Sequence, residues 1–219
     1  MNFLQLCQAV RREAGISGSG PTTTVSQTGE LGKIVEWVLM AYQDIQIINP
    51  TWNFLRADFS FQTIAATSDY LPTAISLDEL SQWNVDGIRS YLTSSGVAGE
   101  RSLHPMSWEW LREVRLFGTI SSGPPVELAI RPSKAIVLWP TPDAAYTITG
   151  EYWKRPQTMT ANTDEPLIKD AFQMAIVWKA VKYYAADQGA AELYATASIN
   201  YTHILNRLEN DQLPEITFG

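Results

Sequence analysis

The spacing of apolar residues changes twice along this chain, and that change most limits the folds open to it. Near both ends, apolar residues recur at the roughly 3.6-residue period of amphipathic helices. Between the ends, apolar and polar residues alternate, as they do along strands. Helices at both ends with strands between them predict an α+β protein. We expect the terminal helices to form a helical bundle and the antiparallel β-rich segment to be inserted into it.

Two helices are predicted in the first fifty residues. Asn2 can cap the first helix, and Gly15 ends it. The second helix runs from Glu30 to Asn49, where Asn49-Pro50 stops it, and its apolar arc is broad enough to include Trp37 and Met40. The segment 16–29 between the helices is rich in Gly, Ser and Thr, so we expect an ordered loop or a flexible strap on the surface.

The middle of the chain predicts strands separated by turns. Phe59 and Phe61 alternate with polar residues in the first strand. Four more strands are expected at residues 88–92, 126–131, 135–139 and 146–153. They should pair antiparallel. A short helix that starts after Ser107 is expected to cover an open face of the sheet.

The last quarter of the chain returns to helical spacing. Asp164-Glu165-Pro166 has the acids and the proline that favour a helix start, and the helix is predicted from Leu167 to about Gln188. Its sides are apolar nearly all round, so it should lie at the centre of the helical domain. Gly189 then turns the chain into a last helix, which makes an antiparallel helix pair.

These patterns predict three parts. Residues 1–55 and 157–212 form a discontinuous helical domain, and residues 56–156 form the β-rich insertion. Residues 213–219 form an extended tail, because Pro214 bars a helix. Leu213, Ile216 and Phe218 make the tail apolar enough to dock in a groove, either on this chain or on a partner.

Charge and composition exclude several classes of protein. The net charge is −7, which disfavours a protein that reads nucleic acid by attracting phosphates but is compatible with a channel through which DNA passes. The single cysteine, Cys7, lies on the apolar side of the first helix and cannot form an internal disulfide. The start of the chain lacks the features of a signal peptide, and no apolar run predicts a membrane span, so we expect a soluble intracellular product.

The sequence also lacks a recognisable catalytic or metal-binding pattern. His104 and His203 lie far apart, and neither has a metal ligand at a suitable spacing. A Gly-x-Ser-x-Gly motif is absent, and Asp78 and Glu79 are more typical of a solvated turn than of a glycosidase pair. We therefore predict that the protein is not an enzyme and has no cofactor.

A series of short motifs occurs along most of the chain. They are Phe3-Leu4-Gln5-Leu6-Cys7, Thr28-Gly29-Glu30-Leu31-Gly32, Trp52-x-Phe54-Leu55-Arg56, Leu138-x-Pro140-x-Pro142-Asp143-x-x-Tyr146, Glu151-Tyr152-x-x-x-Pro156, Asp164-Glu165-Pro166 and Asp211-x-Leu213-Pro214. In this order they resemble the head-to-tail adaptor, or connector, proteins of tailed bacteriophages.

The resemblance implies a structural protein of the virion that is made in the host cytoplasm. It implies a homo-oligomeric ring, commonly of twelve subunits, between the portal protein and a tail or nozzle protein, with double-stranded DNA only as passing cargo and no membrane. The helical domain would form the ring body, and the β insertion would face outward or toward the tail. Docking on the portal would fall on Leu213, Pro214, Ile216 and Phe218, and subunit contacts would fall on Trp37, Met40, Phe172, Trp178 and Tyr183.

Two other hypotheses remain open from the sequence. Trp and Tyr residues of the β insertion could bind sugar by stacking, which would make the protein a tail-associated glycan-binding module. A baseplate or tail-completion protein would share the same structural class and differ only in its neighbour.

Overall fold

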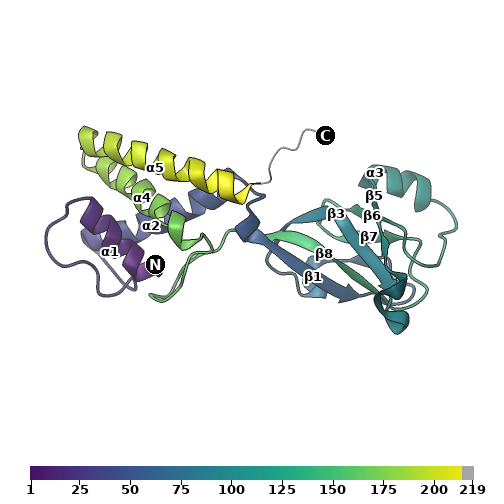
Figure 1. Cartoon of the computed structure of the whole chain (residues 1–219). Coiled ribbons are helices and arrows are strands. Elements are labelled where there is room, and N and C mark those ends of the chain that lie inside the picture. The colour runs from purple at the N-terminus through teal and green to yellow at the C-terminus, as the bar shows by residue number, and fades with distance from the viewer. Residues whose placement is uncertain (214–219) are drawn as a thin grey trace. The chain divides into compact units, whose positions relative to one another are not determined.

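The computed structural model describes residues 1–213, and the chain divides into two compact units (Figure 1). One unit contains residues 1–55 together with the chain from Pro156 onward, and the other contains residues 56–155. We call them the helical unit and the β unit. The protein is thus mixed helix and sheet, and its sheets are mainly antiparallel.

The helical unit is built around one central helix. Its helices are α1 (Phe3–Glu13), α2 (Gly29–Ile48), α4 (Met174–Asp187) and α5 (Ala191–Gln212). Helix α4 packs against α1, α2 and α5. Its buried residues are mostly small or β-branched, such as Ala175, Val177 and Ala180, which lets neighbouring helices approach closely. The prediction that this helix lies at the centre of the helical domain is therefore confirmed.

Helix α1 begins as the sequence predicts. The Asn2 side chain accepts a hydrogen bond from the Gln5 N–H at 2.9 Å, and the Gln5 side chain accepts one from the Asn2 N–H at 2.9 Å. This reciprocal capping box satisfies two backbone donors that the first turn would otherwise leave free.

The predicted start of the third long helix is wrong. A short 3-10 turn at Asp170–Phe172 precedes α4, which begins at Met174 and not at Leu167. The Asp164 carboxylate accepts hydrogen bonds from the backbone N–H groups of Thr160 at 2.6 Å and Ala161 at 2.8 Å. These residues precede Asp164, so its side chain closes a turn behind it and does not cap a helix ahead of it.

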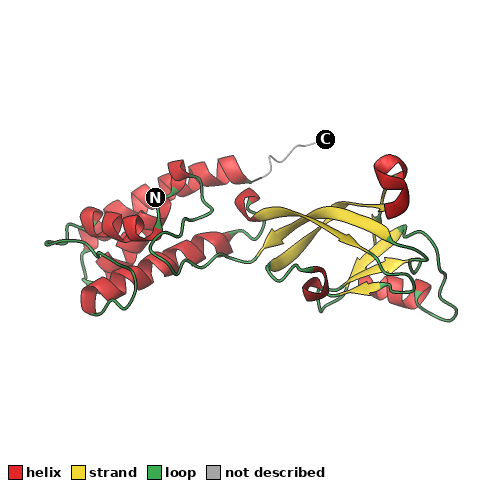
Figure 2. Ribbon diagram, turned by 90° about the horizontal axis from the view of Figure 1, so that it is seen from below, coloured by secondary structure: helices red, strands yellow, loops and turns green. Residues whose placement is uncertain are grey.

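The β unit is a sandwich of two four-stranded sheets (Figure 2). The first sheet has the order β1 (Arg56–Gln62), β8 (Tyr146–Lys154), β3 (Leu80–Leu92) and β4 (Arg101–Ser102). The second has the order β2 (Asp69–Tyr70), β7 (Ile136–Trp139), β6 (Glu127–Ile130) and β5 (His104–Pro105). All neighbouring strands pair antiparallel except β5 and β6, which are parallel.

Both sheets contribute to one aromatic-rich core. Phe59 of β1 meets Trp83 of β3 edge to face, with the ring centroids 5.0 Å apart. Gly150 of β8 lies directly beside this pair. A Cβ atom there would come within 2.9 Å of Phe59 Cε1 and of Ile88 Cγ1, so the packing leaves room only for glycine.

A short helical segment covers the outer face of the second sheet. Helix α3 (Trp108–Trp110) is capped by Ser107, whose Oγ accepts a hydrogen bond from the Trp110 N–H at 3.2 Å. A π-helical turn at Leu111–Arg115 follows, and Leu111 packs on Ala129 and Val137 of the sheet. The prediction that a helix after Ser107 covers an open sheet face is confirmed.

Candidate interaction surfaces

The segment between α1 and α2 is fastened at three places. The Arg11 guanidinium donates to the carbonyls of Ser17 and Ser19, and Gln8 Nε2 donates to the Pro21 carbonyl at 3.0 Å. Asn162 Oδ1 accepts hydrogen bonds from Thr24 N at 2.7 Å and Thr24 Oγ1 at 2.8 Å. Of the two sequence-based alternatives, the structure therefore favours an ordered loop.

The residues predicted to form subunit contacts differ in exposure. Met40 is 49% exposed on α2, whereas Trp37 is half-buried and packs edge-on against Tyr184. Trp178 and Tyr183 are half-buried on α4. Phe172 is only 8% exposed and packs in the core of its own unit, so little of its ring is accessible to another copy, and its subunit contact stays a prediction.

Asp44 ties α2 to α4. It accepts a hydrogen bond from Tyr183 Oη and pairs with Lys179 Nζ at 3.2 Å. Lys179 also lies over the rings of Tyr183 and Tyr201, 5.4 Å from each centroid. Burial, helped by the hydrogen bond to Asp44, raises the pKa of Tyr183, so the phenol stays protonated and continues to donate. This network links three helices and has a structural role.

The outer side of α2 carries exposed apolar residues near its C-terminal end. Met40, Ile47 and Ile48 are all exposed, and Ile47 is the most exposed of them at 65%. We call these three residues the α2 face. Exposed apolar side chains that share one helix side are typical of a surface that another protein covers.

The predicted portal-docking residues lie mostly outside the described part of the chain. Leu213 is half-buried just after α5, and its N–H donates to the Glu209 carbonyl at 2.9 Å. Pro214, Ile216 and Phe218 fall outside residues 1–213. Their predicted contact with the portal stays a prediction.

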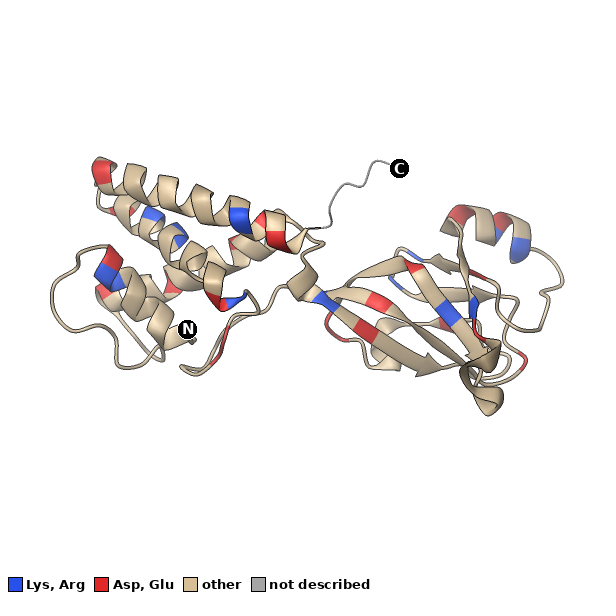
Figure 3. Ribbon diagram, in the orientation of Figure 1, with Lys and Arg blue, Asp and Glu red and all other residues tan. Residues whose placement is uncertain are grey.

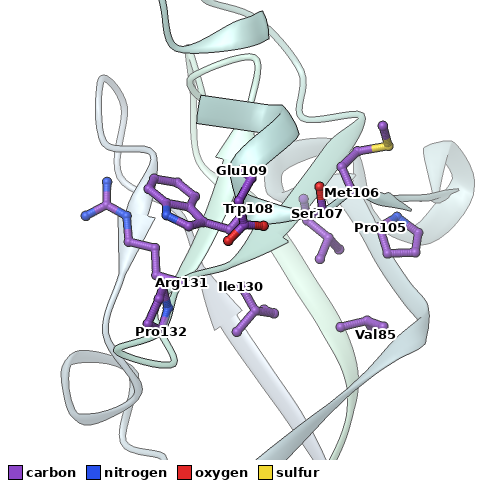
Figure 4. Close-up of a pocket in the computed structure, with 10 residues that line it drawn as sticks. Val85, Pro105, Met106, Ser107, Trp108, Glu109, Ile130, Arg131 and Pro132 are labelled. Atoms are coloured by element: carbon purple, nitrogen blue, oxygen red, sulfur yellow. The ribbon is translucent and has the colours of Figure 1, made fainter. Parts of the chain in front are cut away.

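The β unit contains an apolar hollow lined by residues of β3, β5, β6 and α3. A cavity of about 420 Å³ is lined mainly by Val85, Pro105, Met106, Trp108, Leu128 and Ile130, with Glu109 and Arg131 at its rim (Figure 4). A second hollow of about 330 Å³ shares Val85 and Ile130 with it. Across residues 1–213, the structure contains no group of three or more potential metal ligands.

Half of the twelve aromatic residues of the β unit are unavailable for sugar stacking. Phe59, Phe61, Tyr70, Trp83, Tyr146 and Tyr152 are all buried in the sandwich core. On the outer face, the Arg115 guanidinium lies 4.0 Å from the ring centroid of Trp139 and 5.2 Å from that of Trp110. Arg115 is itself held by two hydrogen bonds to Glu127, at 3.0 and 2.8 Å. The six buried rings are therefore closed to a sugar, Trp110 and Trp139 lie against Arg115, and the glycan-binding hypothesis stays a hypothesis.

The excess of acidic over basic side chains is larger in the helical unit than in the β unit. The helical unit has twelve acidic and seven basic side chains, whereas the β unit has eleven and nine (Figure 3). None of the helices within residues 1–213 combines the length and the apolar character needed to cross a membrane.

A helical unit with an exposed apolar face, joined to a self-contained β sandwich, defines an α+β protein that offers surfaces for assembly. The model of the SU10 adaptor protein family matches residues 1–215. The chain therefore belongs to this family of phage head-to-tail adaptors, which confirms the resemblance found in the sequence and gives the protein a structural role in the virion. No curated protein matches the sequence.

Proposed function

We propose that copies of this chain form a ring beneath the portal protein, join the capsid to the tail and leave a passage for DNA. The number of copies in the ring would be twelve. The observation that carries this proposal is the α2 face. This helix exposes three apolar residues, and in a protein of an adaptor family such a surface suits contact with a neighbouring subunit. The helical unit would form the body of the ring.

Subunit contacts in the ring would involve Met40 together with the half-buried side chains of Trp37, Trp178 and Tyr183. Aromatic residues and methionine are enriched in protein interfaces, where they bury large areas with little loss of side-chain entropy.

The portal would be bound by the C-terminal segment. Leu213, Pro214, Ile216 and Phe218 combine apolar side chains with a proline that prevents helix formation, which suits an extended peptide in a groove. A tail or nozzle protein would bind elsewhere on the ring. Double-stranded DNA would pass through without being held, because a net charge of −7 gives the protein no general attraction for phosphates.

The proposal can be tested by mixing the protein with the portal protein encoded in the same genome and measuring the mass by light scattering. The wild type should give a complex whose mass reports the number of subunits. A variant without residues 213–219 should remain folded, because the last buried residue of α5 is Gln212, and should no longer join the portal.

A matched control keeps the tail length but replaces residues 213–219 with Gly and Ser. If the apolar side chains do the binding, this variant should fail as completely as the deletion. Undiminished capture of either variant would contradict the docking role of the tail. A complex with a tail protein but none with the portal would instead support a tail-completion protein.

A further inference from the structure

We infer that neighbouring copies meet through two different faces of the helical unit, the outer side of α5 in one copy and the α2 face in the next. This inference rests on the proposed ring and specifies how its subunits touch. It assigns a role to α5, whose outer side the sequence analysis did not single out.

Helix α5 carries a long stretch without charge. Residues 193–206, fourteen consecutive positions, contain no Asp, Glu, Lys or Arg. Figure 3 shows α5 with charged residues only near its two ends. Helix α5 packs on α4 through a side that includes Ala197 and Tyr201, and its opposite side exposes Ile199 at 71%. We call this side, centred on Ile199, the α5 face.

The absence of charge on the α5 face is informative because the rest of the helical unit carries nineteen charged side chains, twelve of them acidic. The exposed side of a surface helix is ordinarily polar or charged. Depletion of charged residues is the main compositional mark of the core of an interface. A stretch of fourteen residues spans about 21 Å of helix, which is long enough for a subunit contact.

The α2 face is similarly poor in charge. Between residues 37 and 48 the one charged residue is Asp44, and it is paired with Lys179 of α4. This part of α2 spans about 18 Å, which nearly matches the uncharged part of α5.

The arrangement of the helices favours a second copy as the partner. Both α2 and α5 pack against α4, which lies between them in Figure 1, so the two faces belong to different sides of the unit. A subunit with two different complementary faces forms a closed ring when the rotation between copies permits, whereas a two-fold dimer needs a single self-complementary face. Acidic units would also repel each other unless the touching faces lacked charge.

The two helices run in the same direction, which sets the register of the contact. Lys33 Nζ lies 3.0 Å from the Asp187 carboxylate, so the first turns of α2 lie beside the end of α4. Helix α5 starts at that same end, directly after the turn at Gly189. Counting along both helices from there, Met40 and Ile199 lie at similar heights. In a ring whose axis runs along these helices, neighbouring copies keep these heights, and Met40 of one copy would then approach Ile199 of the next.

The first test places a charge on the α5 face. Ile199→Glu should keep the fold, because the side chain is 71% exposed, and should lower the fraction of protein in rings on the portal by about tenfold or more. The control is Ile64→Glu in the β unit, where the isoleucine is 67% exposed, and it should assemble like the wild type. Circular dichroism would verify that both variants are folded.

The second test uses cysteine cross-linking of the assembled ring with a short bis-maleimide. Cys7 will not interfere, because it is fully buried and burial raises the pKa of its thiol to about 12. A mixture of Met40→Cys and Ile199→Cys copies should give cross-linked dimers, whereas Ile199→Cys alone should give none.

The outcomes separate this inference from the proposed function. Wild-type protein that forms no ring on the portal would overturn both. Rings that form normally with Ile199→Glu, or that cross-link between two Ile199→Cys copies, would overturn only the paired faces. Loss of portal capture by Ile199→Glu without any change in contacts between copies would assign the α5 face to the portal and would also overturn the inference.

Discussion

The two units of this protein place their exposed apolar residues differently. In the β unit, exposed apolar residues lie in loops and turns or in helical turns of five to seven residues; they are Ile64, Leu71, Val97, Val114, Phe117 and Ile120. In the helical unit, most exposed apolar residues lie on helix sides, where Met40, Ile47 and Ile48 share α2 and Ile199 lies on α5. A helix holds its side chains at fixed spacing, so it presents a continuous surface, which isolated loop residues do not.

The units also differ in how they use charge. Ion pairing is similar, with six of nine basic side chains paired in the β unit and four of seven in the helical unit. The helical unit has an excess of acidic residues, yet leaves two helix faces nearly free of charge. The units therefore differ in net charge and in the uncharged helix sides of the helical unit, and not in how many charges are paired.

The strongest test of this comparison is Phe59→Ala in the core of the β unit. Phe59 contacts Trp83, lies 6.5 Å from the Tyr152 ring by centroids and packs directly on Gly150. Removing the ring from this tight core should destabilise the β unit by about 3–5 kcal/mol. Hydrogen exchange should show lost protection in residues 56–155, while α2 keeps its protection.

A matched control is Phe117→Ala, which removes the same ring from a loop where it is 84% exposed. It should leave the stability of the β unit nearly unchanged. Equal loss of protection in both units after Phe59→Ala would show that they unfold together and would contradict their independence.

A smaller effect is expected for Asn162→Ala in the helical unit. Asn162 Oδ1 accepts two hydrogen bonds from Thr24, which is buried. Removing the Asn162 amide therefore leaves two buried donors of Thr24 without a partner. The cost should be about 1–2 kcal/mol. Hydrogen exchange in residues 16–28 should rise, because this loop would lose one of its three attachments.

Asn210→Ala is a suitable control, since Asn210 is exposed on α5. It should leave exchange in the loop unchanged. If Asn162→Ala also left it unchanged, the attachments through Arg11 and Gln8 would be sufficient to order the loop.

The sequence predicted the elements whose signals are local. The strands at β1, β6, β7 and β8 lie within two residues of their predicted positions, and the capping of α1 by Asn2 follows from residue type and spacing. Strand β3 is different. It begins at Leu80, well before the predicted Ile88, and Gly87 with φ 88° and a register shift between Asn84 and Arg89 interrupt its alternation.

Other features depend on contacts that spacing does not encode. The strands β2, β4 and β5 have only two residues each, too few to show a period, so the division into two sheets was not predictable. Asp164 is a residue type that often caps helices, but its carboxylate accepts hydrogen bonds from the preceding residues Thr160 and Ala161, so it closes a turn instead. For the candidate interaction surfaces, the broad apolar arc of α2 correctly indicated that Met40 is exposed. Phe172 lies on a similar apolar arc but is buried by tertiary packing, which the arc alone does not reveal. The absence of charged residues from 193–206 is visible in the sequence, but apolar periodicity, which reports only the buried side of a helix, does not reveal it.

The smallest expected effect concerns acid, and it should fall on the helical unit. Hydrogen bonds from the backbone N–H groups of Thr160 and Ala161 lower the pKa of Asp164. The ion pairs with Lys33 and Lys169 lower the pKa values of Asp187 and Asp211. A carboxyl whose pKa is lower in the folded state than the unfolded value of 3.8 stabilises the fold above that pH. This contribution is lost as the pH falls below 3.8 and passes through the lowered pKa.

Salt should distinguish the pKa shifts caused by ion pairs from the shift caused by backbone hydrogen bonds. Chemical denaturation followed by circular dichroism should show the helical unit losing stability below about pH 4, and the loss should be modest because all three carboxyls are solvent-accessible. High salt should reduce the part that comes from Asp187 and Asp211, because it screens exposed ion pairs, and should leave the part from Asp164 and its backbone donors largely intact. Asp187→Asn should flatten the acid dependence in low salt only. If it flattened the curve equally at high salt, salt would not be screening the Lys33–Asp187 pair, and the pair would be stronger than the exposed pair that its accessibility predicts.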